Sequence, residues 1–296
     1  MNKYHTPVLL KESIDLLKIR KGGKYIDATL GGGGHTKKIL DLGGKVLAID
    51  VDKDAIEYVK EKLGIRNDLI LIKGNFKDID EIAHLNNFNL VDGVIFDLGV
   101  SSHQIDTPKR GFSFLKEGPL DMRMDKDSPV TAEALVNLLG KGELYDIFNN
   151  FGQERRSWFI SNSIIRTRRI KPIQTTGDLT KIIEKAYGIR EGKVTEFTKN
   201  LVNKKVFQAL RIAVNSELEN LEQALPKAIY LLKEKGRIAV ISFHSLEDCV
   251  VKKTFKDFEK KNMGKMITKK PINVSLKEQE ENPRAKSAKL RIFEKN

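Results

Sequence analysis

The chain has 296 residues, of which 40% are hydrophobic and 31% charged, and its formal net charge is +13. This balance is typical of a globular protein and excludes a disordered or fibrous chain. The single cysteine excludes an internal disulfide and a multi-cysteine metal site, and the N-terminal stretch contains neither a signal peptide pattern nor a membrane span. We therefore expect a cytoplasmic protein.

The positive charge is unevenly distributed along the chain. Acidic and basic residues balance in residues 1–100, whereas the net charge is +7 in 101–215, −2 in 216–248 and +8 in 249–296. A basic excess confined to two later segments indicates a polyanionic partner. The alternative is a set of solvated basic helix faces.

In chain order, the first informative segment is KYIDATLGGGGH, residues 24–35. It predicts a strand, a glycine-rich turn and a helix, and a second strand, KVLAID, ends on Asp50. Glycines 31–34 allow close approach of the backbone to a ligand, and the helix N-terminus directs its N–H groups to the same place. Asp50 is placed to accept hydrogen bonds from a ribose diol. We predict an adenosine-type cofactor site, with a plain glycine turn as the alternative.

The glycine turn also distinguishes between two cofactors. In the dinucleotide fingerprint G-x-G-x-x-G, counted from Gly31 and Gly33, the third glycine position is occupied by Thr36. Asp27, just before the turn, would repel a pyrophosphate but attract the ammonium group of a methionine moiety. S-adenosyl-L-methionine therefore fits better than NAD, and an NAD-dependent oxidoreductase stays as the alternative.

Further apolar runs predict the rest of the sheet. Residues 69–76, 90–99 and 236–243 read as strands buried on both faces, separated by amphipathic segments with glycine near their ends. We expect an α/β, doubly wound, mostly parallel Rossmann-like sheet. Two short segments, around 266–271 and 288–294, predict an antiparallel pair at its edge.

A long insertion between Gly99 and about Phe207 interrupts this alternation. Its first part is rich in turn-forming residues and starts where the fourth strand ends, the place where open α/β sheets bind ligands. The rest reads as three or four amphipathic helices. We expect a core of residues 1–105 and 206–296, and a small helical substrate-recognition subdomain of residues 106–205 over the cofactor site.

Asp97, at the end of the fourth strand, is the candidate catalytic residue. Beside a cationic sulfonium, its carboxylate would hydrogen-bond the amino groups of the cofactor or accept a hydrogen from the amine to be methylated. The alternative is a turn or helix cap. Transfer of a methyl group to an exocyclic amine depends mainly on positioning.

Three other side chains receive structural interpretations. Cys249 lies in a predicted helix beside Val250 and Val251 and is expected to be a packed core thiol. Methylation at carbon 5 of a pyrimidine, which needs a cysteine nucleophile, is then disfavoured, and nitrogen or oxygen is the better acceptor. We expect His244 to be a hydrogen-bonding residue at a strand end and Trp158 to lie in the core.

Several longer blocks carry a family resemblance. They are HTPVLLKESIDLL, YIDATLGGGGHT, AIDVDKDAI, FDLGVSSHQID, RGFSF with GPLDMRMD, FQALRIAVNSELENLEQAL, SFHSLED and ENPRAKSAKLRI. With them the chain strongly resembles, almost from end to end, the bacterial 16S ribosomal RNA cytosine N4-methyltransferases, a family known as RsmH or MraW. The resemblance implies methyl transfer from S-adenosylmethionine to the N4 amine of a cytidine in the decoding centre of the small subunit. It also implies a methyltransferase core with a helical insertion that helps to recognise RNA.

The resemblance also implies a set of cofactor-binding residues, and the sequence itself shows no cluster of metal ligands. Asp97 is expected to be the catalytic residue, and Phe76 is expected to flank the adenine. Two departures from the family pattern are His103, where proline is usual, and the pair Lys204 and Lys205, where Thr-Arg is usual. The implied cofactor-binding residues are Gly33, Gly34, His35, Asp50, Phe76, Asp97 and Gln104.

The expected partner is 16S ribosomal RNA in the small subunit or its precursor. The target cytosine would be unstacked into a pocket between the loop after the fourth strand and the insertion. A non-catalytic RNA-binding scaffold would explain the charge but would leave the cofactor site without a role. A homodimer is compatible with the sequence. The residues expected to hold phosphates are Arg155, Arg156, Arg166, Arg168, Arg169, Arg284, Lys286 and Lys289.

Overall fold

The structure, a computed structural model, describes residues 7–188 and 196–296 and divides the chain into two compact units. The first unit comprises residues 1–101 and 218–296, and the second comprises residues 102–217. Relative to the expected insertion of 106–205, the second unit starts earlier and ends later. No helix of the described ranges is long and apolar enough to cross a membrane.

The first unit is built on one eight-stranded sheet with the order β3-β2-β1-β4-β5-β8-β6, in which β7 also pairs with β8. The first five strands run parallel, and β8 is antiparallel to β5, β6 and β7. The doubly wound, mostly parallel sheet and its antiparallel edge are thus confirmed. The strands are β1 (Lys24–Asp27), β2 (Lys45–Asp50), β3 (Leu69–Lys73), β4 (Val91–Asp97), β5 (Leu232–Ser242), β6 (Gly264–Met266), β7 (Ile272–Asn273) and β8 (Lys289–Lys295).

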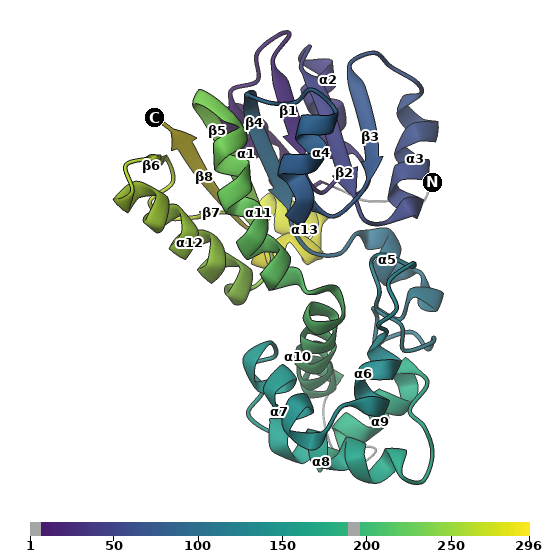
Figure 1. The fold of residues 1–296 in the computed structure, drawn as a ribbon. Coiled ribbons are helices and arrows are strands. Elements are labelled where there is room, and N and C mark those ends of the chain that lie inside the picture. Colours follow the sequence, from purple (N-terminus) through teal and green to yellow (C-terminus); the bar gives the residue numbers. More distant parts are fainter. Residues whose placement is uncertain (1–6, 189–195) are drawn as a thin grey trace. The chain divides into compact units, whose positions relative to one another are not determined.

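Helices cover both faces of this sheet (Figure 1), because alternate side chains of each strand point to opposite faces. On one face, Ile26, Leu47 and Phe96 pack with helices α4, α11 and α12. On the other, Tyr25 and Val46 pack with α1, α2 and α3. The helices are α1 (Leu10–Leu17), α2 (Gly34–Asp41), α3 (Lys53–Leu63), α4 (Ile79–Leu85), α11 (Glu217–Leu231), α12 (Ser245–Lys260) and α13 (Leu276–Glu281), with the 3₁₀ turns η1 (Phe76–Asp78) and η3 (Pro283–Ser287).

Two strand boundaries differ from the expectation for local reasons. β3 ends at Lys73 because Asn75 caps the turn η1, in which Phe76 is the first residue. β5 begins at Leu232, so the polar residues before Gly236 belong to the strand and not to the preceding helix. Apolar runs predicted the buried part of each strand, and the polar extension carried no such signal.

The second unit is helical, with its own hydrophobic core around Phe148, Ile160 and Leu210. Its first loop folds back on itself: Arg110 donates from Nη2 to the carbonyl oxygens of Arg123 and Met124, at 3.0 Å each. The elements are α5 (Ser102–Asp106), η2 (Pro108–Arg110), α6 (Ala132–Leu138), α7 (Lys141–Asn150), α8 (Ser157–Arg168), α9 (Thr176–Ala186) and α10 (Glu196–Asn215).

Candidate active site

Three carboxylates lie at the carboxyl edge of the parallel sheet, at the ends of β1, β2 and β4. Asp27 is level with Ala48 of β2 and Ile95 of β4, and Asp50 and Asp97 follow two residues further along these strands. In open α/β sheets this edge is where ligands bind. The register therefore gathers Asp27, Asp50 and Asp97 at the expected place.

The glycine turn joins β1 to α2 at this edge. Gly33 has φ 71°, in the left-handed region, and a Cβ there would lie 2.8 Å from Val59 Cγ2. A Cβ on Gly34 would lie 2.7 Å from Pro7 Cγ. Both positions require glycine for the packing of the chain itself, a reason that sequence reasoning did not supply. Because no side chain caps α2, its first N–H groups are left for a ligand.

Asp50 is held by two backbone donors. Its Oδ2 accepts from Gly31 N at 2.7 Å and its Oδ1 from Asp52 N at 2.9 Å. Each carboxylate oxygen can accept more than one hydrogen bond, so a diol still finds acceptors here. Burial raises the pKa of Asp50 to about 6, against the lowering effect of these two donors. The residue is thus oriented, and its charge is only partly compensated.

Asp27 stabilises the glycine turn through hydrogen bonds to the residues on either side of it. Its side chain is 1% exposed, and its two oxygens accept from Thr36 Oγ1 at 2.6 Å and from Thr29 N at 3.2 Å. Burial raises the pKa of Asp27 above its usual value. These hydrogen bonds fix the glycine turn, and the ammonium contact expected of Asp27 stays a prediction.

Asp97 and His35 meet between β4 and α2. His35 Nδ1 lies 3.6 Å from Asp97 Oδ2, with the two side chains 5% and 8% exposed. The backbone N–H of Asp97 donates to Thr29 Oγ1 at 2.6 Å, which fixes the end of β4. His35 Nε2 is buried and has no hydrogen-bond partner among the described residues. A buried polar atom left in this way fits a group supplied by a ligand.

The remaining two predicted cofactor residues lie in different units. Phe76 packs edge-on against Phe96 of β4, with ring centroids 5.7 Å apart and an interplanar angle of 87°. This contact fixes one edge of the Phe76 ring just past β3. Gln104 is 5% exposed on α5, in the second unit. The structure thus gathers six of the seven predicted residues in the first unit.

Two interpretations of single residues were wrong. Cys249 is exposed on α12, and Trp158 is 53% exposed on α8. In each helix, neighbouring residues form the buried face, and the residue in question lies outside it. The sequence did not show which face of the helix packs against the core. His244 agrees with its interpretation: it is the N-cap of α12, and its partner Glu247 accepts from Phe243 N at 2.7 Å.

Sequence reasoning missed the side chains that position the site. Thr29 fixes Asp97, Thr36 fixes Asp27, and Glu247 fixes the end of β5. The available signal was their position: Thr29 and Thr36 lie in the turn and helix after β1, and Glu247 lies in the first turn of the helix after β5.

The basic residues divide into two groups. Arg156 donates to Tyr187 O at 3.2 Å, Arg168 donates to Val136 O at 2.8 Å, and Lys289 lies 3.5 Å from Asp248 Oδ2. These three therefore serve the structure as well as the surface. The other residues that were expected to hold phosphates are exposed: Arg155, Arg166, Arg169, Arg284 and Lys286.

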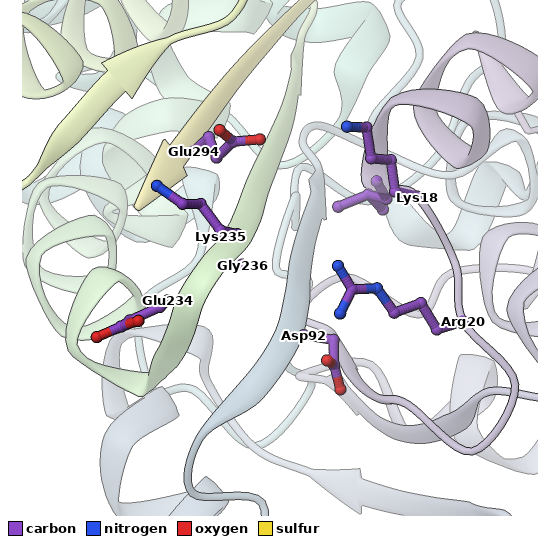
Figure 2. Close-up of a pocket in the computed structure, with 8 residues that line it drawn as sticks. Lys18, Arg20, Asp92, Glu234, Lys235, Gly236 and Glu294 are labelled. Atoms are coloured by element: carbon purple, nitrogen blue, oxygen red, sulfur yellow. The ribbon is translucent and has the colours of Figure 1, made fainter. Parts of the chain in front are cut away.

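A polar cavity of about 230 Å³ lies at the opposite, amino edge of the sheet. Figure 2 shows Arg20 and Asp92 on one side of it and Lys235 and Glu294 on the other. Its cations and anions alternate, and Asp92 already accepts from Lys24 N at 2.9 Å and from Lys233 Nζ at 2.8 Å. This cavity is therefore distant from the strand-end carboxylates, and two of the acidic residues that line it, Asp92 and Glu294, already pair with Lys233 and Arg237.

Comparisons with known proteins give consistent results. The family model described as "MraW methylase family" matches residues 2–296. The chain is 46% identical over 309 residues to a protein of Halothermothrix orenii named ribosomal RNA small subunit methyltransferase H, covering 98% of each. Proteins of the same name from Coprothermobacter proteolyticus and Clostridium botulinum are 42% and 43% identical, again over 98% of this chain and over 96% and 98% of theirs.

Proposed function

This chain belongs to the MraW methylase family, and from that premise we propose that it transfers a methyl group from S-adenosyl-L-methionine to the N4 amine of a cytidine in 16S ribosomal RNA. The observation that carries the proposal is the cluster of oriented carboxylates beside an uncapped helix N-terminus at the carboxyl edge of the sheet.

The residues present fit the proposed cofactor. Asp50 offers acceptors to a ribose diol, Phe76 offers a ring beside the adenine, and the first N–H groups of α2 offer donors to a carboxylate. Gly33 and Gly34 let the turn pack closely against Val59 and Pro7 beside this space, and His35 Nε2 provides a further polar contact. We assign Gln104 the same role from the family resemblance alone.

Asp97 is the proposed catalytic residue. The cofactor supplies a methyl group on a cationic sulfonium, so the carbon–sulfur bond breaks as the nitrogen–carbon bond forms. Asp97 would accept a hydrogen bond from the N4 amine, orient its lone pair toward the methyl carbon, and favour loss of the amine proton. Thr29 and His35 position this carboxylate.

Basic residues of the C-terminal segment lie at the same edge of the sheet. Lys289 is level with Ser242 at the end of β5, and Asp97 is level with Ile241, so the cluster that begins with Arg284 follows the catalytic edge. We assign this cluster to the phosphates that flank the target cytidine. The second unit is proposed as the substrate-recognition subdomain.

The test is mass spectrometry of small-subunit RNA after incubation with the enzyme and isotopically labelled S-adenosylmethionine. A labelled methyl group on N4 of one cytidine is the expected result. Label on carbon 5, on a ribose or on no nucleotide would contradict the proposal. Parallel reactions with free RNA, assembly intermediates and finished subunits identify the substrate form.

Thermal unfolding distinguishes the alternative functions. S-adenosylmethionine is expected to raise the melting temperature, whereas NAD is not, because a ligand stabilises only the protein that binds it. The reverse result would favour the oxidoreductase. Binding to RNA without any methyl transfer would favour the scaffold. We propose a cytoplasmic location because the proposed substrate is ribosomal RNA, and sedimentation would test whether the enzyme is a homodimer.

A further inference from the structure

Helix α8 exposes two adjacent aromatic side chains in the second unit. Trp158 is 53% exposed and Phe159 61% exposed, although rings of this size are usually buried. On the opposite side of the helix, Ile160 and Ile164 are fully buried in the core of the unit. The inner face of α8 thus supplies the contacts that hold the helix to the core. The two aromatic residues lie on the outer face and are not needed for this packing.

The outer face of α8 is also cationic. The segment 155–171 contains five arginines and one lysine and no acidic residue. Arg166 is two turns beyond Phe159 on the same side of the helix, and Arg155 and Arg169 flank its ends. All three are exposed and make no hydrogen bond or ion pair with the described residues, unlike Arg156 and Arg168.

Trp158 is held in position by α7, the helix packed beside α8. Lys141 Nζ lies 3.3 Å from the centroid of the indole ring, and Tyr145 meets it edge-on at 6.1 Å and 78°. The indole therefore has a fixed orientation before any partner arrives, and a second cation lies against it. Glu143 and Asp146, the acidic residues of α7, point to other sides of that helix at helical spacing.

We propose that this outer face of α8, formed by Arg155, Trp158, Phe159, Arg166 and Arg169 with Lys141, is a stacking platform for unpaired bases of single-stranded RNA. Exposed aromatic rings interleaved with arginines are the means by which proteins hold single strands: rings stack on bases and guanidinium groups pair with phosphates. A protein partner would have to bring acidic groups against these cations, whereas a single strand of RNA carries its phosphates along its whole length. The proposal rests on the proposed function, because an RNA substrate supplies the strand.

The single tryptophan of the chain makes the platform directly observable, since all indole fluorescence comes from Trp158. Full-length protein is titrated with a 12-nucleotide single-stranded RNA, with the same sequence as a duplex, and with inorganic polyphosphate. Stacking predicts quenching by the single strand, and little quenching by the duplex or by polyphosphate even where they bind. Equal quenching by polyphosphate, or none by the single strand, would overturn the proposal.

Two variants and their controls separate stacking from charge. Phe159→Ala keeps the reporter and is expected to weaken single-strand binding roughly 5- to 100-fold, whereas Tyr230→Ala, at a 71% exposed ring on α11, leaves it unchanged. The triple variant Arg155, Arg166 and Arg169→Gln is expected to lower the slope of log affinity against log salt by about two. Its control, Lys252, Lys253 and Lys256→Gln on α12, removes the same charge and should keep the slope.

Three further outcomes are decisive. If Phe159→Ala instead converts a dimer into a monomer in sedimentation, the face binds a second copy of the chain and the RNA assignment is wrong. Methyl transfer without single-strand quenching would refute the platform and keep the proposed function. Quenching without methyl transfer would keep the platform and refute the proposed function.

Discussion

Acidic residues at the two edges of the same sheet have opposite electrostatic surroundings. At the amino edge, Asp92 pairs with Lys233 at 2.8 Å and Glu294 with Arg237 at 2.6 Å. Burial opposes their ionisation, but these partners outweigh it, and the pKa of each is lowered. At the carboxyl edge, burial raises the pKa of Asp27 and Asp50, and no described lysine or arginine forms an ion pair with either.

This difference separates the roles of the two edges. At the amino edge, the charges of Asp92 and Glu294 stabilise the fold, since each has a cationic partner. The carboxyl edge keeps charges in an unfavourable environment, with only backbone and hydroxyl donors to hold Asp27 and Asp50 in place. Groups with raised pKa values gathered in this way are typical of functional sites. Substitutions at the two edges should therefore affect different measurements.

The largest expected effect is on catalysis. Asp97→Asn keeps the shape of the side chain and removes its charge, so methyl transfer should fall at least about 100-fold while the melting temperature stays near that of the wild type. The matched control is Asp92→Asn at the amino edge, which should keep activity within about twofold. An active Asp97→Asn enzyme would show that the carboxylate is dispensable.

The second expected effect is on stability. Glu294→Gln removes the charge that faces Arg237, whose side chain is 5% exposed, and should lower the free energy of unfolding by about 3 kcal/mol. Chemical denaturation measures this loss. Activity per folded molecule should not change. A drop in activity at full stability would mean that the amino edge takes part in catalysis.

The third effect compares two glycines of the same turn. Gly33→Ala combines a positive φ with a contact of 2.8 Å to Val59, so it should cost at least about 2 kcal/mol of stability. Gly31→Ala has φ 49° and no atom closer than 3.9 Å, so about 1 kcal/mol is expected. Equal losses in the two variants would show that the contact with Val59 relaxes freely.

The smallest effect is a pH dependence of cofactor binding. Because the pKa of Asp50 is raised to about 6, its carboxylate gains a proton as pH falls through that value and loses acceptors for the ribose diol. Calorimetry should show S-adenosylmethionine binding about tenfold weaker at pH 5 than at pH 7.5. Asp50→Asn should bind weakly at both values. A variant that keeps the tenfold change would assign it to another group.

Cofactor binding is expected to strengthen as pH rises, whereas the contribution of Asp50 to the stability of the ligand-free protein changes in the opposite direction. The pKa of Asp50 is higher in the folded than in the unfolded state, so its contribution to stability is present at low pH and is lost as pH rises through about 6. The lowered pKa values of Asp92 and Glu294 act oppositely, adding stability above pH 4 that is lost on acidification. Their substitution should therefore flatten the acid limb of the stability curve.

The sequence predicted the parts of the fold that depend on local pattern. Apolar runs located the parallel strands, and the acidic residues at the ends of two of them are Asp50 and Asp97. Side-chain burial on helices was harder, because Trp158 and Cys249 sit beside buried positions in segments with several apolar residues. The reasons for Gly33 and Gly34 lie in Val59 and Pro7, contacts that no local pattern reveals.

The division of the chain has a consequence for how it folds and how it can change. Strand β4 pairs with β5 across the whole of the second unit, which has its own core. Loop closure costs grow only with the logarithm of length, roughly 0.6 kcal/mol for each doubling. The equilibrium is therefore nearly indifferent to the size of the inserted unit, whereas the rate of forming the β4–β5 pair is not. Lengthening or exchanging that unit should slow folding far more than it destabilises the sheet.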